Sequence, residues 1–293
     1  NSNNTNMADF FTEVKAPSKI TPVIHIDEFL NKMHGPTKSG LHMANGKMDV
    51  KTKLLTIDVR APVEYTKGHI PGAINIPLFE DAERAVVGTT YKKKGRYEAI
   101  KSGLTFIGPK LTNFLTVIEK HGLKPGDSIL VYCWRGGMRS GAVSWLLSLC
   151  DFKVAKLDGG YRAYRRWCKQ IISRENSPPP TRIFVLGGYT GSGKTAILNE
   201  LSLRGEQFLD LEGFANHRGS AFGWIGQDEQ PTNETYENLL ALAVRRVTDE
   251  KPLWIEHEGS HVGSCSVPIG IHKWVLTTPN NVSIYIVTFF FKE

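Results

Sequence analysis

Short apolar runs separated by glycine-rich and charged stretches recur along the chain. Such runs are long enough for buried strands and too short for helices, and they occupy residues 54–59, 128–132, 183–186, 208–212 and 254–258. Helical patterns follow at residues 109–120, 161–167 and 195–201. A short strand edge near Ile24 leads into a helix that begins near Asp27.

One cysteine stands at the end of a predicted strand. Cys133 follows the run 128–132, and residues 134–139 form a glycine-containing loop. Ser140 is a favourable N-cap for the helix that follows. This arrangement places a thiol above the first turn of a helix, where backbone N–H groups point inward.

Two arginines in the loop add positive charge near this thiol. The backbone donors, the helix dipole, Arg135 and Arg139 all favour thiolate over thiol, so we expect the Cys133 sulphur to be ionised near neutral pH. A buried structural cysteine is the alternative. Two arginines and two glycines directly after the cysteine argue against it, and we take Cys133, Arg135 and Arg139 as candidate catalytic residues.

The second candidate site is a phosphate-binding loop. Residues 188–195 (GYTGSGKT) fit the pattern GxxxxGK[ST], with a predicted strand before and a helix after. Glycines allow backbone N–H groups to close around phosphate oxygens, while the lysine adds charge. The candidate binding residues are Gly188, Gly191, Ser192, Gly193, Lys194 and Thr195, of which Thr195 is also the candidate Mg²⁺ ligand.

Four acidic residues end the next two predicted strands of this domain. Asp210, Glu212, Glu256 and Glu258 are all candidates for the carboxylate that orients a metal ion or water, and the sequence does not select among them. His217 and His261 lie in Gly/Ser-rich surroundings without a partner at metal-ligand spacing. They are predicted either to contact phosphate or substrate or to be plain surface residues.

Length and composition allow two soluble domains. The 293 residues are 41% hydrophobic and 22% charged, with a net charge of +7. The proline-rich stretch 173–181 predicts a stiff spacer. We therefore expect four parts: a loose tail at residues 1–20, a first domain at 21–172, a linker at 173–181 and a phosphate-loop domain at 182–293. The glycine- and lysine-rich stretch 34–50 is predicted to be a surface loop.

Cysteine use and hydropathy indicate a reducing, cytoplasmic environment. The four cysteines form no CxxC pair or His/Cys cluster, so neither a disulfide scaffold nor a structural zinc site is expected. Cys150, Cys168 and Cys265 lack a cationic loop and are predicted to be structural. The longest apolar run, 282–291, is too short to span a membrane.

Two aromatic-basic stretches are candidate polyanion contacts. Residues 91–97 (YKKKGRY) could contact phosphates and stack on bases, although a charge run is more often a solvated face. In residues 161–167 (YRAYRRW) the aromatics fall at helical spacing, so at least two should be buried. The arginines Arg162, Arg165 and Arg166 of this stretch join the predicted basic surface.

The first domain resembles the rhodanese-like family. The resemblance rests on Cys-x₅-Arg-Ser at 133–140, on DVRAPVEYTKGHIPGAINIP at 58–77 and on Gly159-Gly-Tyr followed by Trp167 as a closing element. It implies a rhodanese-like N-terminal domain followed by a P-loop NTPase-like α/β domain. In this family, Asp58 and Arg60 would brace neighbouring loops rather than take part in chemistry.

The combination of both domains resembles the tRNA 2-selenouridine synthases. The strings VYCWRGGMRS (131–140), LGGYTGSGKT (186–195), DLEG (210–213) and NHRGSAFG (216–223) carry this likeness, which runs from about Ile57 to about Trp274. The chain departs from the family before about Asp49 and after Trp274, so the resemblance also implies that the second domain is C-terminally incomplete. The resemblance implies a transferase that replaces the sulphur of 2-thiouridine in the tRNA anticodon arm with selenium.

The resemblance also implies the substrates of this transferase. Selenophosphate would supply selenium through Cys133, and geranyl diphosphate would alkylate the thiouridine sulphur so that it can leave. Lys194, Thr195 and Mg²⁺ would hold and neutralise the diphosphate. The alternative is a rhodanese-type sulphurtransferase or phosphatase fused to a nucleotide-dependent small-molecule kinase. Whether the loop binds a nucleotide or only a diphosphate stays open at this point.

Overall fold

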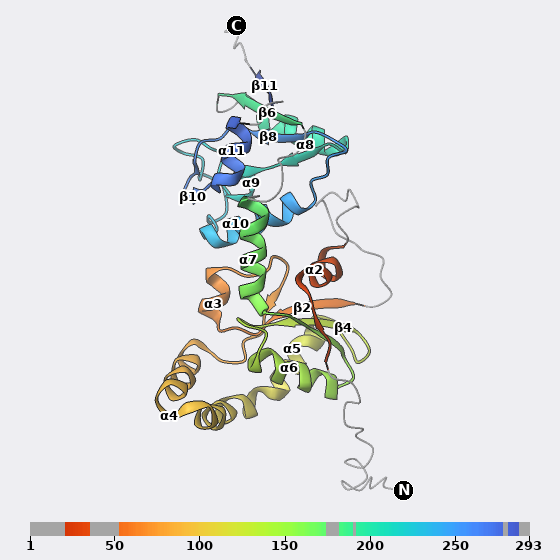
Figure 1. Cartoon of the computed structure of the whole chain (residues 1–293), viewed down its shortest axis with the longest axis vertical. Helices are drawn as coiled ribbons and strands as arrows, with labels where there is room; N and C mark the ends of the chain where they lie inside the picture. The colour runs from red at the N-terminus through yellow and green to blue at the C-terminus, as the bar shows by residue number, and fades with distance from the viewer. Residues whose placement is uncertain (1–20, 36–52, 174–181, 190–191, 278–280, 287–293) are drawn as a thin grey trace. The chain divides into compact units, whose positions relative to one another are not determined.

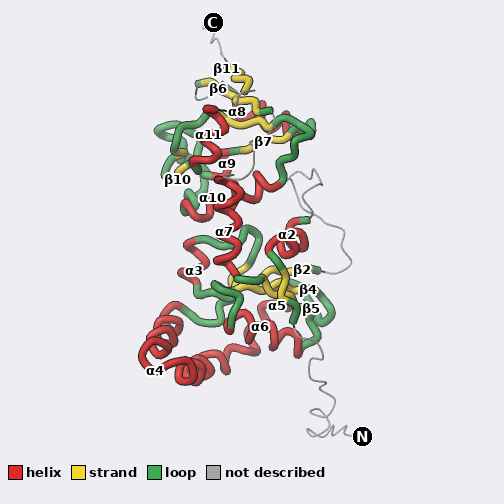
Figure 2. Tube along the Cα trace, in the orientation of Figure 1, coloured by secondary structure: helices red, strands yellow, loops and turns green. Residues whose placement is uncertain are grey.

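The computed structural model describes residues 21–35, 53–173, 182–189, 192–277 and 281–286, which divide into two compact units. Unit 1 comprises Asn1–Phe29, Asp49–Tyr65 and Gly72–Tyr161, and unit 2 comprises Leu30–Met48, Thr66–Pro71 and Arg162–Glu293. Figure 1 follows the chain through both, and Figure 2 separates helices from strands. The predicted tail, the loop from residue 36 onwards and the linker from residue 174 onwards lie outside the described residues.

Unit 1 contains a parallel sheet in the order β1-β5-β4-β2-β3. Its strands are β1 (Val23–Ile24), β2 (Leu54–Asp58), β3 (Ile74–Asn75), β4 (Ser128–Tyr132) and β5 (Lys153–Leu157). The runs at 54–59 and 128–132 therefore form strands as predicted, and they pair in register from Leu54 with Ser128 to Asp58 with Tyr132. The helices around this sheet are α2 (Ile26–His34), α3 (Pro62–Lys67), α4 (Asp81–Ile107), the 3₁₀ turn η1 (Gly108–Lys110), α5 (Leu111–Lys120), α6 (Met138–Leu149) and α7 (Gly160–Ser173).

The central strand β4 is buried on both faces, as its continuous apolar sequence requires. Because side chains alternate along a strand, Ile129 and Val131 join the core that includes α5 and α6. Figure 1 shows these two helices against one face of the sheet. Tyr132 lies on the opposite face, with its ring centroid 6.2 Å from that of Phe29 in α2.

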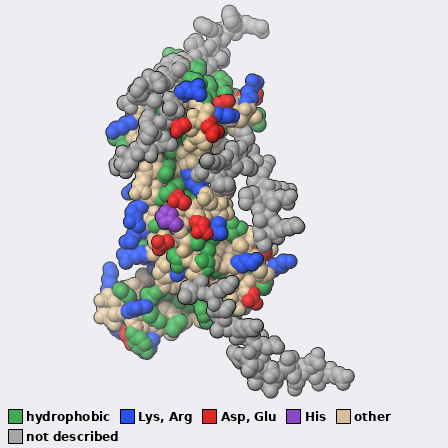
Figure 3. Space-filling model, turned by 45° about the vertical axis from the view of Figure 1, so that its right-hand side comes forward, with side chains coloured by type: hydrophobic (Ala, Val, Ile, Leu, Met, Phe, Trp, Pro, Cys, Tyr) green, Lys and Arg blue, Asp and Glu red, His purple; other side chains and the backbone are tan. Residues whose placement is uncertain are grey.

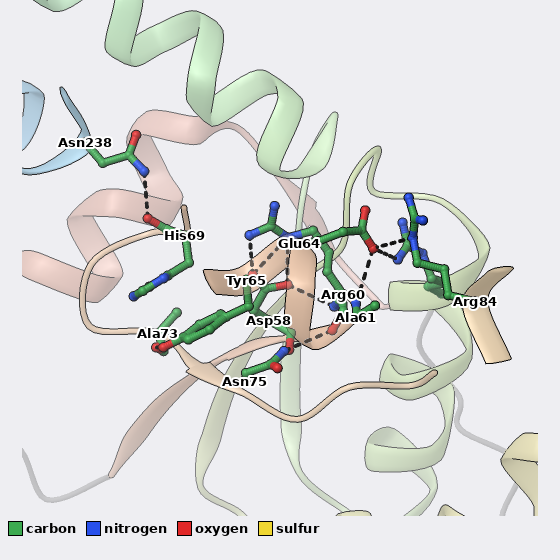
Figure 4. Close-up of polar contacts among 11 residues, drawn as sticks. Asp58, Arg60, Ala61, Glu64, Tyr65, His69, Ala73, Asn75, Arg84 and Asn238 are labelled. Atoms are coloured by element: carbon green, nitrogen blue, oxygen red, sulfur yellow. Dashed lines mark hydrogen bonds and ion pairs between the residues drawn. The ribbon is translucent and has the colours of Figure 1, made fainter. Parts of the chain in front are cut away.

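A buried ion pair follows β2. Asp58 and Arg60 are 0% and 1% exposed, and the Arg60 Nη2 donates to Asp58 Oδ2 at 2.6 Å while Nε donates to both carboxylate oxygens at 2.9–3.0 Å. The guanidinium also lies 3.8 Å from the ring centroid of Tyr161. Burial alone would lower the pKa of Arg60, but the hydrogen bond and charge of Asp58 raise it above its ordinary value. Figure 4 shows this pair beneath the start of α3.

The segment after Pro77 is more helical than the sequence pattern suggested. Only residues 109–120 were predicted to be helical there, yet α4 already begins at Asp81, where Glu80 and Glu83 form a capping box. Gly95 interrupts this helix with φ 83° and ψ −177°. Most of α4 is exposed, and only Ala99 and Gly103 are fully buried, so no continuous apolar stripe marks it in the sequence.

Unit 2 contains a second parallel sheet, in the order β11-β6-β8-β7. Its strands are β6 (Ile183–Gly188), β7 (Gln207–Leu209), β8 (Leu253–Glu256) and β11 (Asn281–Ile286), and β9 (His261–Val262) pairs with β10 (Cys265–Ser266) in a separate antiparallel ribbon. The helices of this part are α8 (Lys194–Leu203), α9 (Leu211–Phe214), α10 (Asn233–Arg245) and α11 (Ile269–Thr277). The strand-loop-helix sequence predicted around the phosphate loop is therefore present.

Helix α7 packs against α10 through aromatic and charged side chains. Tyr161 and Tyr164 are fully buried and Trp167 is 9% exposed, which confirms that the aromatics at helical spacing form core. Arg165 donates to the side chains of Glu237 and Asn238 in α10. The prediction of a basic surface from three arginines is therefore wrong for Arg165, which is 12% exposed because α10 covers it; Arg162 and Arg166 are exposed.

We predict that the Asp58–Arg60 pair stabilises the first unit strongly. Arg60→Leu leaves the buried Asp58 carboxylate without its cation, and such a loss costs about 3–5 kcal/mol. Urea unfolding of the full chain measures this difference. The matched control is Lys101→Ala, which removes an exposed partner of Glu98 (59% and 44% exposed) and should cost less than about 0.5 kcal/mol. Equal losses in both variants would contradict the assigned role.

Candidate active site

The Cys133 thiol lies at the carboxyl end of β4 and is 3% exposed. Its Sγ is 3.2 Å from the Oγ of Ser140, and Ser140 Oγ also lies within donating distance, 3.2 Å, of the Gly137 carbonyl oxygen. Helix α6 begins at Met138 with Gly137 as its N-cap. The prediction that Ser140 caps this helix is therefore wrong, because Ser140 lies within the first turn and turns its hydroxyl to the thiol instead.

Two glycines allow a second segment to close over the cysteine loop. Gly136 and Gly160 have φ angles of 68° and 60°. A Cβ at Gly160 would lie 2.2 Å from the Cys133 carbonyl oxygen and 2.5 Å from the Gly136 nitrogen, so no other residue fits there. The backbone N–H of Tyr161 donates to the same Cys133 carbonyl at 2.8 Å. The start of α7 thus forms one side of the loop.

The side chains that follow Cys133 point outward. Trp134 is 37% exposed, and its ring centroid is 5.9 Å from that of Tyr161. Arg135 is exposed, and its guanidinium makes no hydrogen bond or ion pair with the residues that the structure describes. Arg135 therefore stands at the loop as a cation with unused donors.

Arg139 is held by an acidic residue that the sequence analysis missed. Its Nη1 donates to Glu64 Oε2 at 2.7 Å, and Arg84 Nε donates to the same oxygen at 2.9 Å (Figure 4 labels Glu64 and Arg84). Burial alone would raise the pKa of Glu64, but the hydrogen bond and charge of Arg139 and the charge of Arg84 hold it below its ordinary value. Glu64 and Arg139 are far apart in the sequence, so no spacing pattern could reveal the pair.

The phosphate-loop residues lie between β6 and α8. Gly188 ends β6, and its carbonyl oxygen accepts a hydrogen bond from Lys194 Nζ at 3.0 Å. Gly193 caps α8 with φ 90°, while Thr195 in its first turn is exposed. Ser192 is 9% exposed, and its Oγ is buried without a partner among the described residues. Gly191 lies outside the described residues.

The four predicted carboxylates gather at the carboxyl ends of β7 and β8. Glu256 is fully buried, and its Oε2 accepts from the Glu212 N–H at 3.2 Å while its Oε1 has no partner in the described residues. Burial, with the charges of Asp210 and Glu212, raises the pKa of Glu256 to about 8. Burial and the neighbouring Glu212 raise the pKa of Glu258 to about 7, whereas Lys194 opposes that rise.

Of the four carboxylates, Asp210 has a structural role at a helix end. Asp210 caps α9 by accepting from the Gly213 N–H at 2.6 Å, and burial raises its pKa. Within the described part of the chain, no group of three or more His, Cys, Asp or Glu is arranged to hold a metal ion by itself. A cation at this site would therefore need ligands from a bound phosphate group as well.

The remaining candidates have structural surroundings. His217 is 7% exposed and accepts from the Gly219 N–H at 3.2 Å, so the alternative of a plain surface residue is wrong, and a contact with phosphate or substrate stays a prediction. His261 is exposed beside Ser260. All four cysteines are free, and burial raises the pKa of Cys168 to about 12. No helix of the described residues is both long and apolar enough for a membrane span.

Comparisons with known proteins match both halves of the chain. Residues 42–166 match the rhodanese-like domain family, and residues 181–283 match the family described as tRNA 2-selenouridine synthase AAA domain. The tRNA 2-selenouridine synthase of Hydrogenovibrio crunogenus is 40% identical over 222 residues, which are 72% of this chain and 59% of that protein. The one of Shewanella denitrificans is 39% identical over 214 residues, 72% of this chain and 56% of that protein. A crystal structure of an N-terminal domain from a Clostridium difficile 630 protein is 38% identical, with a TM-score of 0.40, and covers 50% of this chain and 97% of that chain.

The two family matches define the class of protein to which the chain is similar. The chain consists of a rhodanese-like domain followed by a P-loop domain of the AAA type, as the sequence motifs predicted. Its second domain matches the family described as tRNA 2-selenouridine synthase AAA domain, and the curated homologues described above are tRNA 2-selenouridine synthases. The chain spans 59% and 56% of the length of the two relatives described above.

We predict that Glu256 makes the second unit less stable as pH rises. Its pKa of about 8 in the folded state exceeds the ordinary value of 4.5, so the folded chain holds an extra proton between these pH values. Stability from this proton is complete below the ordinary pKa and is lost as pH rises towards 8. Glu256→Gln should therefore raise the urea midpoint over wild type at pH 8 and lose that advantage towards pH 5. Glu250→Gln, an exposed control, should show no such pH dependence.

Proposed function

We propose that the chain is a transferase that replaces the sulphur of 2-thiouridine in the tRNA anticodon arm with selenium from selenophosphate. The observation that supports this most directly is a buried thiol at the carboxyl end of a parallel strand, in a chain whose second domain matches the tRNA 2-selenouridine synthase AAA domain. Neither feature alone would select this reaction, because rhodanese-like domains and phosphate loops occur separately in many proteins.

The thiol is proposed to carry selenium. Sulphur is a soft nucleophile, and the start of α6 offers backbone donors for the oxygens of an anionic selenium donor such as selenophosphate. Arg135 adds exposed donors at the same loop, while Arg139 lies in the first turn of α6. Ser140 Oγ, 3.2 Å from Sγ, can donate to the sulphur when it is ionised.

The phosphate loop is proposed to hold the diphosphate of geranyl diphosphate. A thiocarbonyl sulphur leaves poorly, whereas an S-alkylated one can depart as a thiolate. Lys194 and the N–H groups at the start of α8 would bind the diphosphate that this alkylation releases. The Thr195 hydroxyl and the unpartnered Glu256 Oε1 are oxygen donors of the kind that Mg²⁺ prefers, and a bound Mg²⁺ would neutralise the developing negative charge.

Exposed cations on α4 are proposed to contact tRNA. Lys92, Lys93, Lys94 and Arg96 are all exposed, and Tyr97 beside them is 72% exposed. Lys101 Nζ lies 5.6 Å from the Tyr97 ring centroid, which leaves the ring's other face for a base. Figure 3 shows exposed Lys and Arg side chains in blue.

Two substitutions should separate the two proposed half-reactions. Cys133→Ser should abolish selenouridine but leave S-geranylthiouridine formation, because only selenium transfer needs the thiol. Lys194→Ala should weaken geranyl diphosphate binding and block the S-geranyl product, because the lysine is the main cation of the loop. Mass spectrometry of nucleosides from 2-thiouridine tRNA incubated with selenophosphate and geranyl diphosphate measures both products. Normal selenouridine formation by Cys133→Ser would rule out the carrier role.

The triple change Lys92/Lys93/Lys94→Ala should weaken tRNA binding about equally for different tRNAs. Each lost phosphate contact should reduce the slope of log affinity against log salt by about 0.7–0.9. The matched control is Lys120/Lys124/Lys153→Ala, which removes three exposed lysines near the amino-terminal ends of β4 and β5. If both triples bind tRNA with the wild-type slope, the α4 cations are only a solvated face.

A further inference from the structure

Glu64 brings three donors to one oxygen beside the cysteine loop. Its Oε2 accepts from Arg139 Nη1 at 2.7 Å, from Arg84 Nε at 2.9 Å and from the Ala61 N–H at 3.2 Å. Glu64 lies in α3, four residues after Arg60. The buried Asp58–Arg60 pair therefore anchors the chain just before the first residue of this helix. Figure 4 shows the side chains converging on this carboxylate.

The charges around Glu64 do not cancel. Glu64 is 12% exposed and faces two guanidinium groups, Arg139 at 23% and Arg84 at 48% exposure. One carboxylate with two cations leaves an excess of one positive charge. A carboxylate that only neutralised Arg139 would not require the second arginine.

Arg139 keeps most of its donors free. Its guanidinium reaches Glu64 through Nη1, and no bond from Nη2 or Nε to a described residue accompanies this contact. Arg139 precedes Ser140, whose Oγ lies 3.2 Å from the Cys133 sulphur. A planar guanidinium held at one nitrogen presents its other N–H groups in a fixed direction.

We propose that Glu64 is a positioning residue that fixes Arg139 so that its free N–H groups meet an oxyanion bound in the Cys133 loop. Arg84 donates to the same Glu64 oxygen and helps to keep the carboxylate in place. The ligand class is a tetrahedral oxyanion of the phosphate type. The inference deepens the proposed function, which supplies the identity of the anion as selenophosphate, but the arrangement itself concerns any such anion.

Glu64→Gln distinguishes positioning from simple charge compensation. Removal of a negative charge beside an anion site should by itself strengthen anion binding. Loss of a positioning partner should weaken it, because Arg139 is no longer held by a charge-assisted bond. The two explanations therefore predict opposite signs for the same variant.

The test compares alkylation of Cys133 by iodoacetate and by iodoacetamide in the full chain. In both reactions the thiolate forms an S–C bond and iodide leaves, but only iodoacetate carries a carboxylate that Arg139 can bind. We expect Glu64→Gln to lower the iodoacetate-to-iodoacetamide rate ratio by about tenfold, the typical value of a charge-assisted hydrogen bond. Inorganic phosphate should protect wild-type Cys133 from alkylation, and the same protection of the Glu64→Gln variant should require about tenfold more phosphate. Cys133→Ser gives the background from the other cysteines.

The matched control is Glu83→Gln, which makes the same chemical change at a carboxylate paired with Lys110 at 2.6 Å rather than with the loop arginine. Its rate ratio should equal that of wild type. A ratio that rises or stays unchanged in Glu64→Gln overturns the proposal. Because Glu64 acts through Arg139, adding Glu64→Gln to Arg139→Gln should cause no further loss, and an additional tenfold loss would also overturn the proposal. These readouts use no selenium or tRNA, so a chain that makes no selenouridine would refute the proposed function without touching this inference.

Discussion

A buried guanidinium determines the geometry of the cysteine loop. Arg60 cannot be left unpaired in the interior, so Asp58 at the end of β2 must meet it, and both are almost fully buried. The same guanidinium lies 3.8 Å from the Tyr161 ring centroid. Tyr161 in turn donates its backbone N–H to the Cys133 carbonyl oxygen. One buried cation thus connects the end of β2, the start of α7 and the end of β4.

In both sheets, the candidate functional residues lie at the carboxyl ends of parallel strands. Cys133 follows β4, Gly188 ends β6, and Asp210 and Glu256 stand at the ends of β7 and β8. At the carboxyl end of a parallel strand, the chain turns into a helix whose first N–H groups have no partner within the helix. Each unit therefore offers donors for an anion. The first unit adds a thiol to those donors, and the second adds the Lys194 ammonium.

The second site combines a cation with carboxyl groups that resist ionisation. Burial is the main cause of the raised pKa values of Glu256 and Glu258; the charges of Asp210 and Glu212 add to it for Glu256, and Glu212 adds to it for Glu258. Lys194 opposes the rise for Glu258. A ligand that brings its own cation would change this balance, because the added positive charge favours the ionised carboxylates. A ligand that binds at the phosphate loop with its cation should therefore also promote ionisation of these carboxyl groups.

The sequence alone determined strands β2, β4, β6 and β8, the two domain classes and the positions of the thiol and the phosphate loop, whereas the predicted strand 208–212 ends at Leu209 because Asp210 caps α9. These depend on local patterns: an apolar run such as Ser128–Tyr132 forms a strand wherever it is buried, and GYTGSGKT needs only the neighbouring strand and helix. Helix α4 has no such pattern because most of it is exposed. The start of α6 was predicted at Ser140 because serine is a favoured N-cap residue, but in the fold the helix begins after Gly137. Only the tertiary structure showed that Arg139 meets Glu64, that Arg165 is covered by α10 and that the carboxylates gather. Their partners lie tens of residues away, and burial and charge pairing at that distance depend on how the strands and helices pack rather than on any local spacing.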